Sequence, residues 1–369
     1  MAAEEEASHV VRGGEVQSRR VIELRSDNAA GVAPEILAAV RAANTGSALA
    51  YGGDDLTAHL QDVVRAVFEH PTARVFPVTS GTAANALALS AATPPWGAVL
   101  CHPSAHIITA EGGATSLLGG GVVMRGVEGA HALIDPANLR VVLEGVRWGD
   151  PHESQPSVLS LTLPSDRGTV YQPDQVAKLT AIGREFGLRA HVDGARIANA
   201  VAALGCSPAD VTWRAGVDVL SLGATKNGAL SAEAIVAFDD RIAEELVYRT
   251  KRSGHVTSKM RFQSAQVTAY LTDGLWLRLA TNANQQMAEL VAELQSLASY
   301  GLRLQERVDV NMTFVDLPAA AIDSVAGAGV RFYRMGPTSL RLVTSWQTTA
   351  EEVTEASSRF REAVLGQAG

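Results

Sequence analysis

The sequence has few of the features that mark secreted, metal-binding or membrane proteins. It contains only 2 cysteines in 369 residues, which allow neither a disulfide framework nor a Cys-x-x-Cys metal motif. No uninterrupted apolar run approaches the roughly 20 residues that a helix needs to span a bilayer. The N-terminus, Met-Ala-Ala-Glu-Glu-Glu, lacks the apolar stretch of a secretory signal. We therefore expect a soluble, cytoplasmic protein.

Basic residues are outnumbered by acidic ones. The chain has 31 Lys and Arg against 39 Asp and Glu, which gives a net charge of -8. This balance argues against binding to nucleic acid or to acidic membranes, because both attract positive charge. Charged residues make up 19% of the chain and hydrophobic residues 47%, and there are 33 glycines. Such a composition is typical of a compact, glycine-punctuated α/β enzyme.

Short apolar segments alternate along the chain with segments of helical periodicity. Strands are expected at 75–78, 158–163, 191–193 and 234–238, and helices at 34–43, 56–67, 83–92, 136–146 and 174–186. This alternation implies a largely parallel sheet covered by helices. The length allows two or three domains, with enough chain to bury a large core.

The C-terminal third has a different pattern. Long helices are expected from 265 to about 300, followed by strand-like segments at 312–315, 330–333 and 339–343. We therefore expect a mobile N-terminal tail over residues 1–20, a large domain over 21–255 and a smaller α+β domain over 256–369.

The stretch 218–229 places a lysine where a short apolar strand ends. Lys226 stands between small residues rather than among the charges of a helix face. A lysine in that position loses solvation, so the pKa of its ammonium group falls and the free amine becomes a nucleophile toward carbonyl carbon. That is the chemistry of a Schiff base. The alternative is an ordinary lysine in a surface loop.

A second strand ends in His191-Val192-Asp193-Gly194-Ala195-Arg196. In open α/β sheets, ligands bind at the carboxyl ends of the strands. Asp193 and Arg196 could form a local ion pair on the turn. Beside a Schiff-base lysine, they match the needs of pyridoxal phosphate, which uses an anion to keep its ring nitrogen protonated and a cation near its phenolic oxygen.

A serine-glycine-threonine turn joins the strand at 75–78 to the next helix. Ser80, Gly81 and Thr82 put hydroxyl and backbone N–H groups at the positive end of that helix, which suits a phosphate. Simple N-capping by Ser80 or Thr82 is the alternative. Because the turn precedes Lys226 in the order expected of a pyridoxal-phosphate site, we favour phosphate binding.

These motifs together resemble the fold-type I pyridoxal-phosphate enzymes. The Asp-Gly-Ala-Arg run, the Ser-Gly-Thr turn and the Thr-Lys-Asn-Gly form of the lysine motif are similar to those of the threonine aldolase, or β-eliminating lyase, family, and most like its low-specificity L-threonine aldolases. The resemblance extends from about Leu24 to the C-terminus. It implies a fold-type I, transferase-like α/β architecture, with a mostly parallel central sheet in the large domain and a smaller α+β C-terminal domain. It also implies a homodimer or homotetramer with active sites at the subunit interface.

The segment 101–114 contains two histidines four residues apart. Pro103 argues against a regular helix through His102 and His106, and no third ligand with metal-site spacing is visible, so we expect no metal. The resemblance places His106 on the face of the pyridine ring. There an imidazole limits the tilt of the ring and can serve proton transfer near Cβ.

The resemblance also implies contacts to the substrate. Ser26, whose local pattern is that of a helix cap before Pro34, corresponds to a serine that touches the substrate carboxylate. Arg341 interrupts an apolar strand, where a buried guanidinium needs a carboxylate. The family assigns this arginine to the α-carboxylate of the substrate, and an internal ion pair is the alternative. Tyr51 corresponds to a tyrosine close to the cofactor, in some members across a subunit boundary.

Two more positions complete the expected site. Arg261 ends the one dense basic run, at 249–261, and is expected to reach a neighbouring subunit's site, with a solvated surface as the alternative. In the loop 164–168 many threonine aldolases carry a histidine near the substrate hydroxyl, and this chain has none there. Ser165 or Asp166 could take part of its place, or Asp166 could bond only its own backbone. The departure leaves the base and the threo or erythro preference open.

The expected reaction is a retro-aldol cleavage of a β-hydroxy-α-amino acid, such as L-threonine, L-allo-threonine or phenylserine, to glycine and an aldehyde. Lys226 is expected to hold the cofactor, and Arg341 and Ser26 the substrate carboxylate. Asp193 keeps the ring nitrogen protonated, and His106 takes the hydroxyl proton directly or through water. The alternatives are β-elimination or aminotransfer on the same scaffold, and a non-catalytic binding protein.

Overall fold

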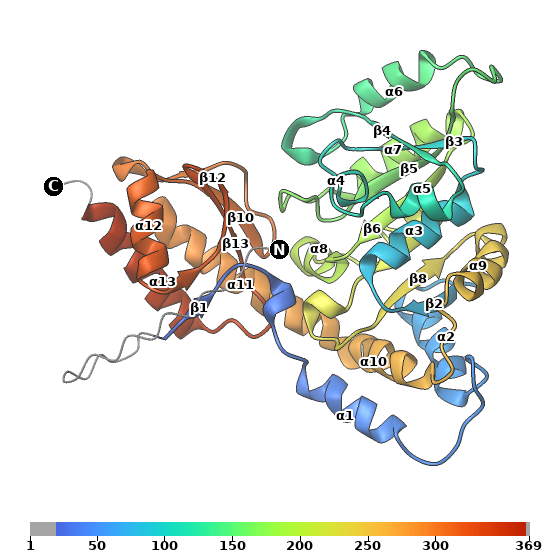
Figure 1. Ribbon diagram of the computed structural model, residues 1–369, viewed down its shortest axis with the longest axis horizontal. Helices are drawn as coiled ribbons and strands as arrows, with labels where there is room; N and C mark the ends of the chain where they lie inside the picture. The colour runs from blue at the N-terminus through green and yellow to red at the C-terminus, as the bar shows by residue number, and fades with distance from the viewer. Residues whose placement is uncertain (1–19, 367–369) are drawn as a thin grey trace.

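The computed structural model describes residues 20–366 and is built around a seven-stranded sheet (Figure 1). The strand order is β2-β8-β7-β6-β5-β3-β4. All neighbouring strands are parallel except β8, which is antiparallel to β2 and β7. The prediction of an α/β fold with a mostly parallel sheet is confirmed. The strands are β2 (Arg74–Val78), β3 (Gly97–Cys101), β4 (Val123–Gly126), β5 (Gln155–Thr162), β6 (Arg189–Gly194), β7 (Val219–Leu222) and β8 (Glu233–Ala237).

The inner strands read as continuous apolar runs because both faces of the sheet are covered. Every residue of β3, β7 and β8 is buried. Successive side chains of a strand point to opposite faces, so Val219 lies in one buried cluster and Leu220 in the other. The sheet is therefore the middle layer of the larger lobe, and only the ends of its strands are available to a ligand.

The first two helices of the larger lobe begin where their sequence signals predict, within one residue. Pro34 occupies the first turn of α1 (Pro34–Ala43), and the Asp54 side chain caps α2 (Asp55–Val67) by accepting from Thr57 N at 2.9 Å. The others are α3 (Gly81–Ala92), α4 (His106–Thr109), α5 (Ala114–Leu118), α6 (Pro136–Glu144), α7 (Pro173–Glu185), α8 (Ile197–Leu204), α9 (Asp240–Arg252) and α10 (Arg261–Leu271).

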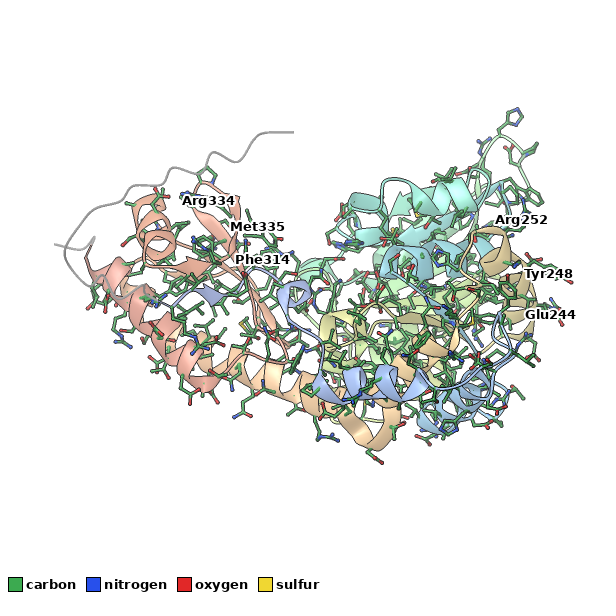
Figure 2. All side chains as sticks on the ribbon, turned by 60° about the horizontal axis from the view of Figure 1, so that its bottom comes forward. Glu244, Tyr248, Arg252, Phe314, Arg334 and Met335 are labelled. Carbon is green, nitrogen blue, oxygen red and sulfur yellow. The ribbon has the colours of Figure 1, made fainter. Side chains whose placement is uncertain are left out.

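After the strand at 234–238 the sequence predicts a helix with Ile242, Leu246 and Val247 on its apolar side, and the structure differs from this at one position. On α9, Ile242 and Leu246 are buried, but Val247 is 43% exposed. A helix turns about 100° per residue, so Val247 lies away from the stripe that the other two share. The exposed neighbour Tyr248 projects from the outside of this helix, at the end of the molecule opposite to Met335 (Figure 2).

The smaller lobe contains a four-stranded antiparallel sheet, in the order β12-β13-β10-β9, packed against helices. Strand β1 (Ile22–Glu23) pairs with β11 (Val330–Arg331) at its side. The elements are α11 (Leu275–Gln295), β9 (Arg303–Leu304), β10 (Met312–Asp316), α12 (Ala319–Gly327), β12 (Tyr333–Gly336), β13 (Ser339–Val343) and α13 (Ala350–Leu365).

Both lobes contain chain from each side of the expected boundary. Ile22 and Leu24 are buried in the core of the smaller lobe, whereas Tyr270 of α10 is buried in the core of the larger one. The division into domains 21–255 and 256–369 stays a prediction. The tail expected at 1–20 lies outside the described residues except for Arg20.

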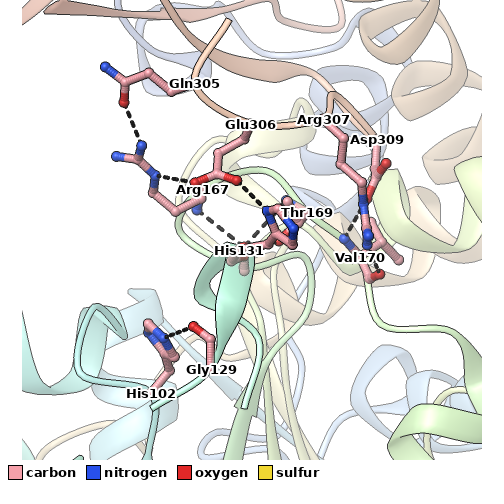
Figure 3. A network of polar contacts seen from close by, with 11 residues as sticks. His102, Gly129, His131, Arg167, Thr169, Val170, Gln305, Glu306, Arg307 and Asp309 are labelled. Atoms are coloured by element: carbon pink, nitrogen blue, oxygen red, sulfur yellow. Dashed lines mark hydrogen bonds and ion pairs between the residues drawn. The ribbon is translucent and has the colours of Figure 1, made fainter. Parts of the chain in front are cut away.

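Polar contacts fasten the lobes together (Figure 3). His131 Nδ1 lies 2.6 Å from Glu306 Oε2, and Arg167 Nη2 donates to Gln305 Oε1 at 2.5 Å. Val170 N donates to Asp309 Oδ2 at 2.9 Å. Loops that follow β4 and β5 are thus held against the segment that leads into β10, so the loops at the carboxyl end of the sheet have a fixed neighbour.

Within residues 20–366, no helix is both long and apolar enough to cross a bilayer. The same residues contain no cluster of three or more His, Cys, Asp or Glu side chains placed to hold a metal ion.

Candidate active site

A cavity of about 400 Å³ lies where the parallel strands of the larger lobe end and β12 and β13 of the smaller lobe approach. Sites of this kind suit small molecules. Of the expected site residues, the cavity lining omits Tyr51, Arg261 and the alternative candidate Ser165, which is buried against Thr169. The expected residues that do line it are Ser26, Ser80, Gly81, Thr82, His106, Asp166, Asp193, Arg196, Lys226 and Arg341.

Lys226 lies in a short 3-10 turn that follows β7. The turn is anchored by the buried Asn227, whose Nδ2 donates to Trp276 O at 2.8 Å and to Tyr270 Oη at 3.0 Å. Burial, and then the positive charge of Arg196, lowers the pKa of the Lys226 amine. Within residues 20–366, Lys226 forms no ion pair. The amine therefore faces the cavity without a fixed anionic partner, which is not the environment of a surface-loop lysine.

Asp193 is the buried carboxylate at the end of β6. It is 3% exposed, and it stands opposite Ser221 of β7. Its Oδ1 accepts from Ala195 N at 3.1 Å, and its Oδ2 accepts from Asn85 Nδ2 at 3.0 Å. Because both donors are neutral, the negative charge of Asp193 is not cancelled by a neighbouring cation and is available to the cavity.

Arg196 pairs with Asp27, not with Asp193. Its Nε and Nη2 donate to the two carboxylate oxygens of Asp27 at 2.6 and 3.0 Å, in a bidentate fork. Asn311 Nδ2 donates to the same carboxylate at 3.2 Å. Burial alone would raise the pKa of Asp27, but Arg196 outweighs it, so the pKa is lowered. This pair fixes the Arg196 guanidinium beside the cavity and ties it to the smaller lobe.

The serine-glycine-threonine turn presents a helix N-terminus to the cavity. Ser80 Oγ accepts from Ala83 N at 3.2 Å, so Ser80 does cap α3. Gly81 opens the helix, and a Cβ placed there would meet nothing within 4 Å. Capping and anion binding are compatible here, because Ser80 takes only the N–H group of Ala83, and the first N–H groups of a helix have no partner within it.

Ser26 caps a short 3-10 turn and not the helix that begins at Pro34, whose N-cap is Ala33. Ser26 Oγ accepts from Asn28 N at 3.2 Å, at the start of a 3-10 turn over Asp27–Ala29, and the residue also lines the cavity. Its contact to a substrate carboxylate stays a prediction.

His106 and Asp166 meet on one wall of the cavity. His106 N donates to Asp166 Oδ2 at 3.1 Å, and the His106 ring places Nδ1 2.9 Å from Glu111 Oε1. The hydrogen bond to Glu111 raises the pKa of His106. Burial, and then the charge of Asp193, raises the pKa of Asp166 to about 6. Asp166 thus bonds another segment of the chain, not its own backbone.

A second carboxylate close to Lys226 also titrates near neutrality. Glu233, at the start of β8, accepts from Ala224 N at 2.6 Å, and burial raises its pKa to about 7. Lys226 acts in the opposite direction, but burial has the larger effect.

Arg341 on β13 is a half-buried guanidinium without a carboxylate partner among residues 20–366. Its Nη2 donates to Arg25 O at 3.4 Å, and its planar group lies 4.9 Å from the centre of the Tyr333 ring. Burial, and then the charge of Arg196, lowers the pKa of Arg341. The internal ion pair that the sequence left open is not found in the described part of the chain, so the guanidinium fork can take a carboxylate from outside.

Tyr51 and Arg261 lie elsewhere. Tyr51 is 59% exposed and packs under Lys251, whose Nζ is 4.5 Å from the ring centre. Arg261 begins α10 and lines a separate groove between α1 and α10. One chain therefore does not bring either side chain to the cavity, and their expected roles stay predictions.

Several residues of the cavity were not singled out from the sequence. The sequence carries no local signal for Asn85, Glu233, Met312 and Tyr333, and it assigns no role to Asp27, the ion-pair partner of Arg196. Glu111 did carry a local signal, because it follows His106 by five residues in a Glu-Gly-Gly run, yet no role was assigned to it.

Comparison with known proteins agrees with this architecture. Residues 23–320 match the family described as beta-eliminating lyase. The chain is 40% identical, over 340 residues, to the low specificity L-threonine aldolase of Pseudomonas aeruginosa, covering 91% of this chain and 96% of that protein. It is 26% identical over 345 residues to the corresponding Escherichia coli protein, covering 92% and 98%.

Solved structures give the same result. The Leishmania major threonine aldolase superimposes with a TM-score of 0.86 and 26% identity, covering 93% of this chain and 99% of that one. Aspartate aminotransferase from Thermus thermophilus, at 16% identity and a TM-score of 0.66, shares the fold alone. The resemblance that the sequence motifs suggested is confirmed: this chain belongs to the beta-eliminating lyase family.

Proposed function

We propose that this chain is a pyridoxal-phosphate-dependent aldolase that cleaves L-threonine, L-allo-threonine or related β-hydroxy-α-amino acids such as phenylserine to glycine and an aldehyde. The observation that carries the proposal is the placement of Lys226, Asp193 and Arg341 around one cavity. The names of the similar proteins, low specificity L-threonine aldolase and threonine aldolase, support the choice of reaction.

The residues of the cavity fit pyridoxal phosphate. Lys226 offers an amine with a lowered pKa for its aldehyde, and Asp193 offers a buried carboxylate for its ring nitrogen. The N-terminus of α3 at Gly81 offers N–H groups for its phosphate. When bound, this cofactor supplies an electron sink for the pair of electrons released at Cα. Arg196, fixed by Asp27, is the cation assigned to the phenolic oxygen.

The smaller lobe supplies the substrate carboxylate site. Arg341 has a free planar fork, and its stacking on Tyr333 restricts the plane in which the fork can lie. Ser26 lines the same cavity and offers a second polar contact. Holding the carboxylate fixes the orientation of the amino acid, so that one bond at Cα is presented for cleavage.

The pKa values of the two side chains favour Asp166 over His106 as the acceptor of the β-hydroxyl proton. With a pKa of about 6, Asp166 is mostly ionised at neutral pH and can take a proton. The contact with Glu111 favours the protonated form of His106, which cannot accept another proton. His106 is assigned to the face of the bound ring, where it limits movement.

We also infer that the protein is cytoplasmic and acts as a homodimer or homotetramer. The exposed Tyr51 and the distant Arg261 are the residues that would complete a neighbouring subunit's site. Light scattering of the purified protein measures the subunit number, and a monomer with full activity would contradict this inference.

Product analysis tests the proposed reaction. With L-threonine or phenylserine, the protein supplied with cofactor should form glycine and the corresponding aldehyde in equal amounts. Ammonia and a keto acid would identify β-elimination, and transfer of the amino group to an added keto acid would identify an aminotransferase. Binding without any product would indicate a non-catalytic protein.

A further inference from the structure

We propose that Glu111 is a positioning residue that orients the His106 ring and, through Asn85, joins it to Asp193. The proposal rests on the proposed function, because it concerns the same cavity, and it adds two residues to which no role has been given. It states that the residues on two sides of the cofactor site are one hydrogen-bonded unit: His106, Glu111, Asn85 and Asp193.

The side chain of Glu111 is buried, whereas that of His106 is partly exposed. Glu111 lies between α4 and α5, and its side chain is 1% exposed, against 43% for the side chain of His106. Oε1 of Glu111 lies 2.9 Å from His106 Nδ1 and accepts from Asn85 Nδ2 at 2.9 Å. Within residues 20–366, Oε2 has no hydrogen-bond partner. Among residues 20–366, Glu111 has its ion-pair contact with His106, so the buried carboxylate and the ring hold each other in place.

This contact keeps a proton on Nδ1 of His106 in both the neutral and the charged form of the ring. A carboxylate accepts hydrogen bonds, so Nδ1 must be the donor toward Glu111, and Nε2 is the nitrogen left for the cavity. The backbone N–H of His106 is held as well, by Asp166 Oδ2 at 3.1 Å. With backbone and ring both fixed, the plane of the imidazole is set before any ligand arrives.

Asn85 extends this contact to Asp193. The two hydrogens of its amide nitrogen go to different carboxylates, Glu111 at 2.9 Å and Asp193 at 3.0 Å. Asn85 comes from α3, the helix whose N-terminus forms the phosphate side of the cavity. A neutral double donor lets two buried carboxylates share one region without bonding each other. The cavity wall, the ring-nitrogen carboxylate and α3 are thereby connected.

The charged groups that face His106 raise the pKa of its ring, with the exception of Lys226. Glu111 and Asp193 favour the protonated ring, and Glu111 has the largest effect; Lys226 opposes it, as does burial. Asp166 is bonded to the backbone of His106. Removing the charge of Glu111 while keeping its shape should therefore shift the titration of His106 to lower pH.

The test is the titration of the His106 ring in full-length protein supplied with cofactor but without substrate. Carbon-13-labelled histidine makes the ring visible by NMR, and His106→Gln assigns its signal. Glu111→Gln should lower the midpoint of the His106 titration, and kcat should fall roughly 10-fold to 100-fold, as for the loss of a partner that orients a metal-binding histidine. In Asn85→Ala, the His106 ring should still titrate, but the absorption spectrum of the bound cofactor should change.

The chain offers a matched control in a second histidine–glutamate pair. His131 and Glu306 make the same kind of contact, at 2.6 Å, between the lobes and outside the cavity (Figure 3). Glu306→Gln should leave both the His106 titration and the cofactor spectrum unchanged.

An unchanged His106 midpoint in Glu111→Gln, or an equal shift in Glu306→Gln, would overturn the proposal. If Glu111→Gln does not fold, the unaltered protein still decides, because its His106 must titrate above the ordinary value of about 6.5. A midpoint at or below that value contradicts the proposal. The titration is measured without turnover. A protein without aldolase activity would therefore refute the proposed function, and the titration would still test the role of Glu111.

Discussion

The cavity and the contact between the lobes use the same charged residue types in opposite ways. Between the lobes, cations and anions are matched: Arg307 Nε donates to Asp309 at 2.8 Å, and Glu306 receives both His131 and Arg167 (Figure 3). In the cavity, Arg196 is paired with Asp27, but Lys226 and Arg341 form no ion pair within residues 20–366, although both are at least half-buried.

The difference separates structural charges from functional ones. A buried charge without a partner costs folding free energy, so it persists where a ligand supplies the missing opposite charge. The pKa values support this distinction, because Asp166 and Glu233 are raised to about 6 and 7 by burial. Substitutions in the cavity should therefore change chemistry more than stability, and substitutions between the lobes should do the reverse.

The largest effect is expected from Lys226→Ala. Without the amine, the covalent attachment of the cofactor is lost, and aldolase activity should fall by roughly 1000-fold or more. The measurement is kcat for phenylserine. Lys178→Ala removes an exposed lysine from α7 and should leave kcat unchanged. If Lys226→Ala kept a rate within 10-fold of the unaltered protein, the distinction between the charges of the cavity and those between the lobes would be wrong.

Arg341→Ala should give the next largest loss. Removing one member of a charge-assisted pair costs about 2–5 kcal/mol, so kcat/KM should fall by roughly 30-fold to a few thousand-fold, mostly through KM, with the cofactor still bound. Arg334→Ala is the control, since Arg334 on β12 is already paired with Asp323 at 2.7 Å and lies outside the cavity. Equal kinetics for the two variants would refute the assignment of Arg341 to the substrate carboxylate.

Asp166→Asn should change the pH dependence. The carboxylate must be ionised to accept a proton, and with its pKa raised to about 6 the ionised fraction falls as the pH drops through 6. The unaltered enzyme should lose activity below that pH. The asparagine variant should lack this acid limb and be slower by roughly 100-fold at neutral pH. A variant that kept the acid limb would move the proton acceptor to another residue.

Glu306→Gln should have the smallest effect on catalysis. It breaks the partly exposed contacts with His131 and Arg167, so the free energy of unfolding should fall by about 1 kcal/mol or less, with kcat unchanged. Urea denaturation followed by circular dichroism measures the first quantity. A large loss of activity without a loss of stability would show that this contact belongs to the site.

Much of the fold could be predicted from local patterns. The helix 34–43 was expected from Pro34 and has those bounds, and the strands before Asp193 and Lys226 were expected from buried apolar runs. These features depend on neighbours in sequence, where capping and periodicity are visible. The placement of Lys226 and Asp193 in one cavity followed from the rule that parallel strands end at the same edge.

The partners of the site residues could not be predicted in this way. Asp27 lies 169 residues before Arg196, and Asn85 lies 108 residues before Asp193. Such contacts are created by the packing of lobes and helices, and a single sequence carries no periodicity that reports them. Val247 was misplaced for a related reason, because an apolar residue beside a helical stripe is not distinguished from one within it.

The most direct test of the central claim is to locate the covalent attachment of the cofactor. The chain has four lysines, Lys178, Lys226, Lys251 and Lys259. Borohydride reduction of the protein with bound pyridoxal phosphate, followed by peptide mass mapping, should place the added mass on Lys226 alone. Attachment at one of the other three lysines, or no attachment in a protein that still forms glycine and aldehyde, would contradict the account.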